Sequence, residues 1–202
     1  RKESSAASDV YKRQAYTSKL DGILHSMAFG QFDMERPKFH QTSRKNFLQA
    51  VQISSFSLVE IANSLTQLLS DQASIVTLSI SSTKATSYGY LGPIKAMLET
   101  TVCYLAKSLS EYGEIRVNSV GAGPLKTSAS AGIPNYIENY LYSEELTLRK
   151  KSLQTHEVAN TVAFLLSEYS SGINAENIIV DAGMNSNYFD QDIVLNFSKN
   201  SL

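Results

Sequence analysis

Hydrophobic and polar positions follow two patterns along this chain. Short continuous runs of apolar and β-branched residues are typical of strands buried on both faces, whereas apolar residues three or four positions apart are typical of amphipathic helices. The first pattern predicts strands at residues 21–28, 74–80, 115–123 and 177–183. The second predicts long helices at residues 43–69 and 93–112, short helices within 128–151, and a helix capped by Thr155.

This alternation of strands and helices favours βαβ units around a parallel sheet, in one α/β domain. A dinucleotide-binding fold opens with a strand, a glycine-rich turn and a helix that holds the pyrophosphate, and no such opening precedes residue 21. Residues 1–14 are rich in Ser, Ala and charge without any periodicity, so we predict a scar or disordered segment there. Residues 15–202 are predicted to form a partial Rossmann-like, doubly wound parallel sheet whose first βαβ units are missing.

The composition of the chain excludes several classes of function. With 18 basic and 19 acidic residues interleaved, the chain has no basic face for nucleic acid or an anionic membrane, which favours small-molecule chemistry. The single cysteine, Cys103, excludes an intrachain disulfide and is predicted to be a buried hydrophobe in a cytoplasmic protein. No apolar run is long enough for a membrane span. The three histidines, His25, His40 and His156, lack metal-ligand spacing, so no metal site is predicted.

The stretch "YGYLGPIK" at residues 88–95 is the main candidate for chemistry. At about 100° per residue, Tyr88 and Lys95 would share a helical face, while Tyr90 would point elsewhere. Pro93 is tolerated only in a first helical turn, so Tyr88 is expected to precede the helix. A nearby ammonium would lower the pKa of the phenol, whose hydroxyl can donate to a carbonyl oxygen that gains negative charge. The alternative is a surface tyrosine beside a solvated lysine.

Further blocks fall in a fixed order around this stretch: "LDGILHSMAFG", "ISSFSLVEIA", "VTLS", "IRVNSVGAGPLKTSASAGI", "EVANTVAFLLSEYSSGI" and "IIVDAG". With them, residues 19–183 resemble the NADH-dependent enoyl-acyl-carrier-protein reductases of the short-chain dehydrogenase/reductase superfamily. The Tyr-x6-Lys spacing is that of this family, since the wider superfamily uses Tyr-x3-Lys and would require a tyrosine where Leu91 stands. The resemblance implies hydride transfer from NADH, or NADPH, to the β-carbon of a trans-2-enoyl thioester on acyl carrier protein, in fatty-acid synthesis by a homotetramer.

The resemblance also assigns roles to individual residues. Tyr88 would donate to the thioester carbonyl, and Lys95 would hydrogen-bond the nicotinamide ribose. Leu125 would offer main-chain groups to the nicotinamide carboxamide, and Thr127 would lie near the pyrophosphate. The remaining cofactor-binding positions are Met27, Lys126, Ser128 and Ala129, and the substrate-binding positions are Gly30 and Tyr136. Gly121 and Gly123 are expected to allow close approach to a ligand, or to form a plain turn.

Two departures from the family leave alternatives open. Ile80 follows Ser79 where the family usually has a second tyrosine, so a serine there could polarise the carbonyl instead. Three alternatives therefore stay open. The protein is a different reductase of the superfamily, such as a carbonyl reductase, or a non-catalytic partner subunit of the same fold, or a pure binding module. The missing opening implies that the chain alone is inactive, aggregates and binds NADH poorly, because the strand at 21–28 becomes a sheet edge. In the implied tetramer the two long helices pack on symmetry mates, with Phe56 and Tyr104 on a second buried face.

Overall fold

The computed structural model describes residues 18–31, 38–127, 130 and 136–199. Within them, four parallel strands form one sheet in the order β1-β2-β3-β4, namely Leu20–His25, Leu69–Ile80, Arg116–Ala122 and Asn177–Val180. The predicted α/β class and parallel sheet are confirmed, and β1 lies at an edge of the described sheet, as expected. The segment predicted as a scar, residues 1–14, lies outside the described residues.

The helices mostly follow the predicted ranges. The α-helices are α2 (Arg44–Val51), α3 (Ser57–Leu65), α4 (Leu91–Leu109), α5 (Tyr136–Leu146), α6 (Thr155–Leu166) and α7 (Gln191–Lys199). Short 3₁₀ turns lie at η1 (Phe39–Gln41), η3 (Thr66–Leu68), η4 (Thr86–Tyr88), η6 (Glu168–Ser170) and η7 (Met184–Ser186). In the described ranges, no helix has the length and apolar character needed to cross a membrane.

Three details of the helices differ from the predictions. The segment predicted as one helix at 43–69 is interrupted by a π-helical turn, η2 (Gln52–Phe56), which joins α2 to α3. The cap of α6 is Gln154 and not Thr155, because the Gln154 N–H donates to the Glu157 carboxylate at 2.8 Å. Helix α7 was not predicted, and three of its apolar residues, Val194, Leu195 and Phe197, remain exposed.

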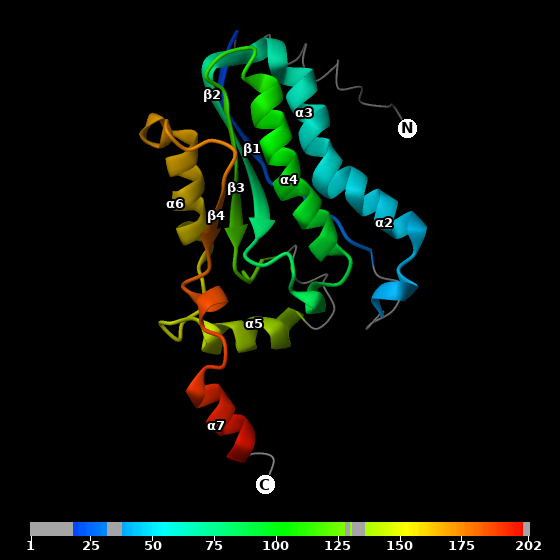
Figure 1. The fold of residues 1–202 in the computed structure, drawn as a ribbon, viewed down its shortest axis with the longest axis vertical. Helices are drawn as coiled ribbons and strands as arrows, with labels where there is room; N and C mark the ends of the chain where they lie inside the picture. Colours follow the sequence, from blue (N-terminus) through cyan, green and yellow to red (C-terminus); the bar gives the residue numbers. More distant parts are fainter. Residues whose placement is uncertain (1–17, 32–37, 128–129, 131–135, 200–202) are drawn as a thin grey trace.

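Helices cover both faces of the sheet (Figure 1). Ile75 of β2 points to the face covered by α3 and α4, where it packs with Leu58 and Leu98. Its neighbour Val76 points to the opposite face, where it packs with Leu165 of α6. Because successive strand residues face opposite ways, an apolar run such as 74–80 supplies both cores at once.

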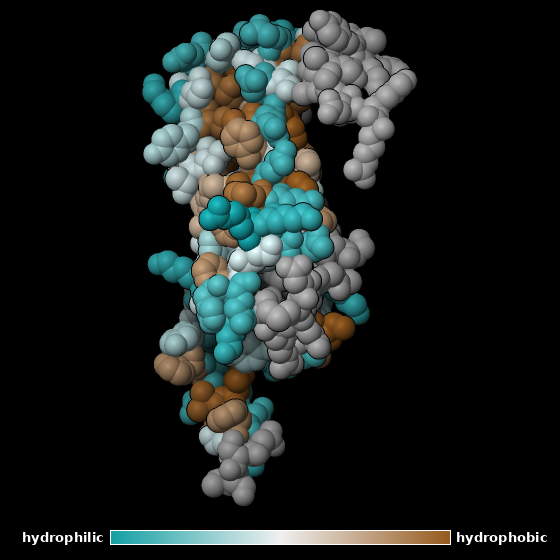
Figure 2. All heavy atoms as spheres, turned by 90° about the vertical axis from the view of Figure 1, so that its right-hand side faces the viewer, coloured by the Kyte–Doolittle hydropathy of each residue, from teal (hydrophilic) through white to brown (hydrophobic). Residues whose placement is uncertain are grey.

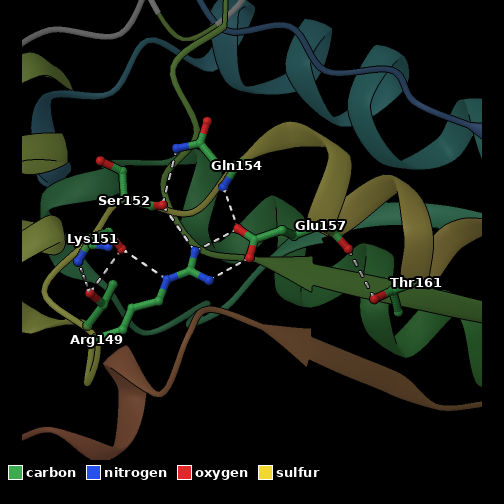
Figure 3. Close-up of polar contacts among 7 residues, drawn as sticks. Arg149, Lys151, Ser152, Gln154, Glu157 and Thr161 are labelled. Carbon is green, nitrogen blue, oxygen red and sulfur yellow. Dashed lines mark hydrogen bonds and ion pairs between the residues drawn. The ribbon is translucent and has the colours of Figure 1, made fainter.

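The loop between α5 and α6 is held by Arg149 (Figure 3). Its guanidinium makes two parallel contacts with the Glu157 carboxylate, at 2.5 and 2.6 Å, and donates to the Ser152 carbonyl oxygen at 3.1 Å. These bonds lower the pKa of Glu157 to about 2. Solvent weakens this ion pair, but it fixes a loop whose Leu148 N–H donates to the Ala182 carbonyl oxygen, just after β4.

Candidate functional site

The candidate site lies at the carboxyl ends of the strands. Three segments leave the sheet at this end, namely residues 26–31 after β1, 81–90 after β2 and 123–127 after β3. Helix α5 lies across the same end of the sheet (Figure 1). Ligands of open parallel α/β sheets bind outside the carboxyl ends of the strands. The fold therefore brings most of the residues to which the sequence assigned roles to the carboxyl end of the sheet.

Tyr88 ends the η4 turn, three residues before α4 begins. Pro93 lies in the first turn of α4, so the prediction that Tyr88 precedes the helix is confirmed. Burial, with a smaller effect from Tyr136, raises the pKa of Tyr88 to about 12. The expectation that Lys95 lowers this pKa is wrong, because the cost of burying the phenolate dominates. The hydroxyl therefore stays protonated at neutral pH and remains a hydrogen-bond donor.

Lys95 is buried, with 5% of its surface exposed, and its ammonium donates to the Leu78 carbonyl oxygen at 2.7 Å. Burial lowers its pKa to about 8, and the nearby Glu99 opposes that shift. One residue further along β2, the Ser79 hydroxyl donates to Glu99 at 2.5 Å. Sequence reasoning missed Glu99, although its position one helical turn after Lys95 was a usable signal.

Met27 and Gly30 lie in the loop that follows β1. Met27 is 41% exposed, while Gly30 is packed so closely on α4 that a Cβ atom there would lie 3.0 Å from Leu91 Cδ1. Two hydroxyls hold this loop by its main chain, namely those of Ser54 and Tyr90. Neither Ser54 nor Tyr90 was assigned a role from the sequence, because their hydrogen-bond partners are distant along the chain.

The cofactor-binding positions after β3 begin at Leu125. Its N–H donates to the Tyr136 hydroxyl and its carbonyl oxygen accepts from the same hydroxyl, both at 2.8 Å. Lys126 and Thr127 are exposed, and the Thr127 N–H donates to Ser130 Oγ at 3.0 Å. The other two predicted positions, Ser128 and Ala129, lie outside the described residues. Tyr136, which the sequence assigned to the substrate, therefore contacts a position assigned to the cofactor.

The two glycines of β3 and its loop are needed for packing between strands. A Cβ atom at Gly121 would lie 2.7 Å from Ile179 Cδ1 and 2.9 Å from the Ile80 carbonyl oxygen. A Cβ atom at Gly123 would lie 3.2 Å from Asp181 Cβ. These contacts account for both glycines without any ligand, so close approach to a ligand is not needed to explain them.

His25 ends β1 inside a buried network. The Ser57 hydroxyl donates to the Ile53 carbonyl oxygen at 2.7 Å, so Ser57 Oγ accepts from His25 Nε2–H at 2.9 Å. His25 Nδ1 then accepts from the Thr77 hydroxyl at 2.8 Å. Burial, and next the charge of Lys95, lower the pKa of His25 to about 4. The neutral imidazole therefore joins β1, β2 and α3 beside the site.

Cys103 corrects a further expectation. It lies on the exposed side of α4, and its thiol donates to the Ala175 carbonyl oxygen at 3.4 Å. The apolar run around it suggested burial, but the turn of the helix points it outward. Within the ranges described, no three His, Cys, Asp or Glu side chains gather as they would around a metal ion.

Comparison with known proteins shows the family of this chain. The family model described as Enoyl-(Acyl carrier protein) reductase matches residues 1–185. The NADH-dependent enoyl-acyl-carrier-protein reductase FabI of Nostoc sp. is 38% identical over 167 residues, covering 82% of this chain and 64% of the relative. The NADPH-dependent FabI of Staphylococcus aureus is 37% identical over 169 residues, covering 83% of this chain and 66% of the relative.

Solved structures extend the likeness to the fold. The NADH-dependent enoyl-acyl-carrier-protein reductase of Aquifex aeolicus superposes with a TM-score of 0.84 at 30% identity, covering 89% of this chain and 71% of that structure. The Bacillus cereus enzyme in complex with NADP⁺ and an indole naphthyridinone gives a TM-score of 0.82 at 32% identity, covering 88% of this chain and 70% of that structure. The predicted Rossmann-like fold and family resemblance are confirmed. The chain spans just under two thirds of the length of the two curated relatives, 64% and 66%, and it belongs to the enoyl-acyl-carrier-protein reductase family.

Proposed function

We propose that the protein is an enoyl-acyl-carrier-protein reductase, which reduces the double bond of a trans-2-enoyl thioester in fatty-acid synthesis. The observation that carries the proposal is the location of both a protonated Tyr88 hydroxyl and a buried Lys95 at the carboxyl end of a parallel sheet. Its substrate would be the enoyl group carried by acyl carrier protein, as the names of the relatives suggest.

The residues at this edge fit a nicotinamide cofactor. The Leu125 main chain offers one donor and one acceptor, both of which now bind the Tyr136 hydroxyl. A carboxamide carries the same complementary pair of groups, so it could replace that hydroxyl. The Lys95 ammonium would hold the ribose, and Met27 would lie beside the cofactor. Relatives are named for either NADH or NADPH, and the bound nucleotide would supply the hydride.

Tyr88 would perform the polar part of the reaction. When hydride reaches the β-carbon of the thioester, negative charge develops on the carbonyl oxygen of the resulting enolate. A phenol with a pKa of about 12 holds its proton and donates a hydrogen bond to that oxygen. The partly buried position of Tyr88 strengthens this bond, since it limits the access of competing water.

The alternative in which a serine polarises the carbonyl has less support. The Ser79 hydroxyl already donates to Glu99, and only 6% of the Ser79 surface is exposed. A hydroxyl has one proton to donate, so Ser79 would have to leave Glu99 before it could bind a substrate. This observation favours an enoyl reductase over a carbonyl reductase of the wider superfamily.

Oxidation of the cofactor tests the proposal. We expect the whole protein to oxidise NADH or NADPH with crotonyl and longer trans-2-enoyl thioesters, and to leave simple ketones nearly untouched. The rate is measured spectrophotometrically with each cofactor in turn, and a reaction without thioester serves as the control. Turnover of ketones above that of enoyl thioesters would favour the carbonyl reductase, and no turnover of either would favour a non-catalytic subunit or binding module.

We also propose that the protein forms a homotetramer in the cytoplasm. Large apolar side chains remain exposed on the helices expected to pack on symmetry mates, at Leu48, Phe56, Met97 and Tyr104, the last with 76% of its surface exposed. The side of the molecule that carries α2 and α3 shows hydrophobic residues among hydrophilic ones (Figure 2). Covering such residues is what an interface between copies would do.

Sedimentation of the whole protein should therefore give the mass of four chains. A Tyr104→Glu, Phe56→Glu double variant should sediment as a smaller species, because it would bury two charges in each copy of the interface. A Tyr169→Glu variant is the control, since Tyr169 lies on η6, outside these helices. A wild-type protein that is active and stable as a monomer would contradict the proposal.

A further inference from the structure

Two hydroxyls hold the main chain on either side of Gly30. The Phe29 N–H donates to Ser54 Oγ at 2.8 Å, and the Ser54 hydroxyl donates to the Phe29 carbonyl oxygen at 3.1 Å. The Gln31 N–H donates to the Tyr90 hydroxyl oxygen at 2.8 Å, and that hydroxyl donates to the Gln31 carbonyl oxygen at 2.7 Å. Each hydroxyl thus satisfies both polar groups of one residue, as a neighbouring strand would.

Both hydroxyls come from well-packed elements. Ser54 belongs to the π-helical turn between α2 and α3 and is fully buried. Tyr90 is the N-cap residue just before α4, is 4% exposed, and packs its ring at 6.2 Å from that of Phe47. The loop itself is more exposed, with Met27 at 41% and Phe29 at 38%. The four hydrogen bonds therefore tie a partly exposed loop to two well-buried side chains.

The attachment by Tyr90 links two parts of the site. Tyr90 is separated from Tyr88 only by Gly89, whose φ of 61° is a conformation that favours glycine, and both tyrosines pack in the same apolar cluster. Tyr88 precedes the helix that carries Lys95, while Gln31 follows Gly30 directly. The hydroxyl of Tyr90 therefore sets how far the loop after β1 lies from the start of α4, where Gly30 already contacts Leu91.

We propose that Tyr90, assisted by Ser54, is a positioning residue that fixes the loop around Gly30 against the start of α4 and so shapes the place where the enoyl chain binds. This inference rests on the proposed function for its substrate. Tyr90 does not act on the thioester, because its hydroxyl proton is donated to Gln31. Ser54 holds the Met27 side of the loop, so removing the Tyr90 hydroxyl leaves that side attached.

The test is a Tyr90→Phe variant of the whole protein, which keeps the ring and its contact with Phe47. We expect faster hydrogen exchange at the Gln31 amide, with the Phe29 amide still protected by Ser54. We also expect the KM and the Kd for crotonyl and longer enoyl thioesters to rise about tenfold, with kcat and the Kd for the cofactor changed less than twofold. If Tyr90 only stabilised the fold, its substitution would lower the melting temperature without this selective effect on thioester binding.

Tyr169→Phe is the matched control, since Tyr169 is 84% exposed and lies on η6. It should behave as wild type in every assay. Gln31 exchange equal to wild type in Tyr90→Phe would overturn the inference whatever the activity, as would faster exchange with unchanged thioester binding. A wild-type protein that binds thioester without reducing it would refute the proposed reaction alone, because the Kd and exchange data still decide the role of Tyr90.

Discussion

Replacing Tyr88 by phenylalanine should reduce kcat for enoyl thioesters about 100- to 1000-fold and leave the Kd for NADH nearly unchanged. The variant removes one hydroxyl while its ring keeps packing against the apolar cluster that includes Leu91 and Ile94, so the fold should be retained. The loss falls on kcat because the hydroxyl meets charge that exists only as the reaction proceeds. Steady-state kinetics and calorimetric titration with NADH measure the two quantities separately.

The control for this experiment is Ser79→Ala, which removes a hydroxyl that donates to Glu99. We expect it to keep kcat within about tenfold of wild type, since it breaks a supporting hydrogen bond and no contact with the substrate. Full turnover by Tyr88→Phe together with an inactive Ser79→Ala would reverse the roles of the two residues. Because the pKa of Tyr88 is about 12, its donor function should also persist well above pH 8.

Replacing Lys95 by methionine should have opposite effects on stability and on binding. Burial lowers the pKa of Lys95 from 10.5 to about 8, a difference equivalent to about 3 kcal/mol against folding while the lysine is charged. Methionine fills a similar volume without charge but loses the bond to Leu78, so we expect a net gain of about 1–3 kcal/mol near pH 7. The Kd for NADH should rise about 10- to 100-fold, because the ammonium would no longer hold the ribose.

The pH dependence of this gain has a defined sign. Between pH 8 and 10.5 the unfolded chain keeps the Lys95 proton while the folded chain loses it, so the wild type gains stability as pH rises. The stability difference between Lys95→Met and wild type should therefore shrink across that window. Denaturant unfolding at several pH values measures it, and Lys107→Met, an exposed position on the same helix, is the control. A constant difference across the window would show that charge burial at Lys95 is not the cause.

The secondary structure of the core followed from local patterns in the sequence. Ile94, Leu98 and Val102 recur at helical spacing, and all three are at most 1% exposed in α4. The start of α4 was likewise accessible, because Pro93 is tolerated only in a first helical turn and therefore places Tyr88 before the helix. Patterns of this kind reflect which side of an element is buried, and burial on one side repeats with the period of that element.

The π-helical turn at residues 52–56 interrupts a segment whose apolar periodicity predicts a continuous helix. The outward position of Cys103 was also missed, because an apolar run does not state which helical side faces the core. In both cases the neighbouring elements decided the outcome, since intrinsic preferences are weak beside tertiary packing.

By itself, the sequence determined the order of strands and helices, the family and the candidate pair of Tyr88 and Lys95. Only the tertiary structure decided which hydroxyl meets which group: Tyr90 binds Gln31, 59 positions away, and Ser79 binds Glu99. It also decided that burial raises the pKa of Tyr88 and lowers that of Lys95. The physical reason is that hydrogen-bond partners and desolvation depend on what surrounds a side chain in space, and residues distant along the chain supply those surroundings.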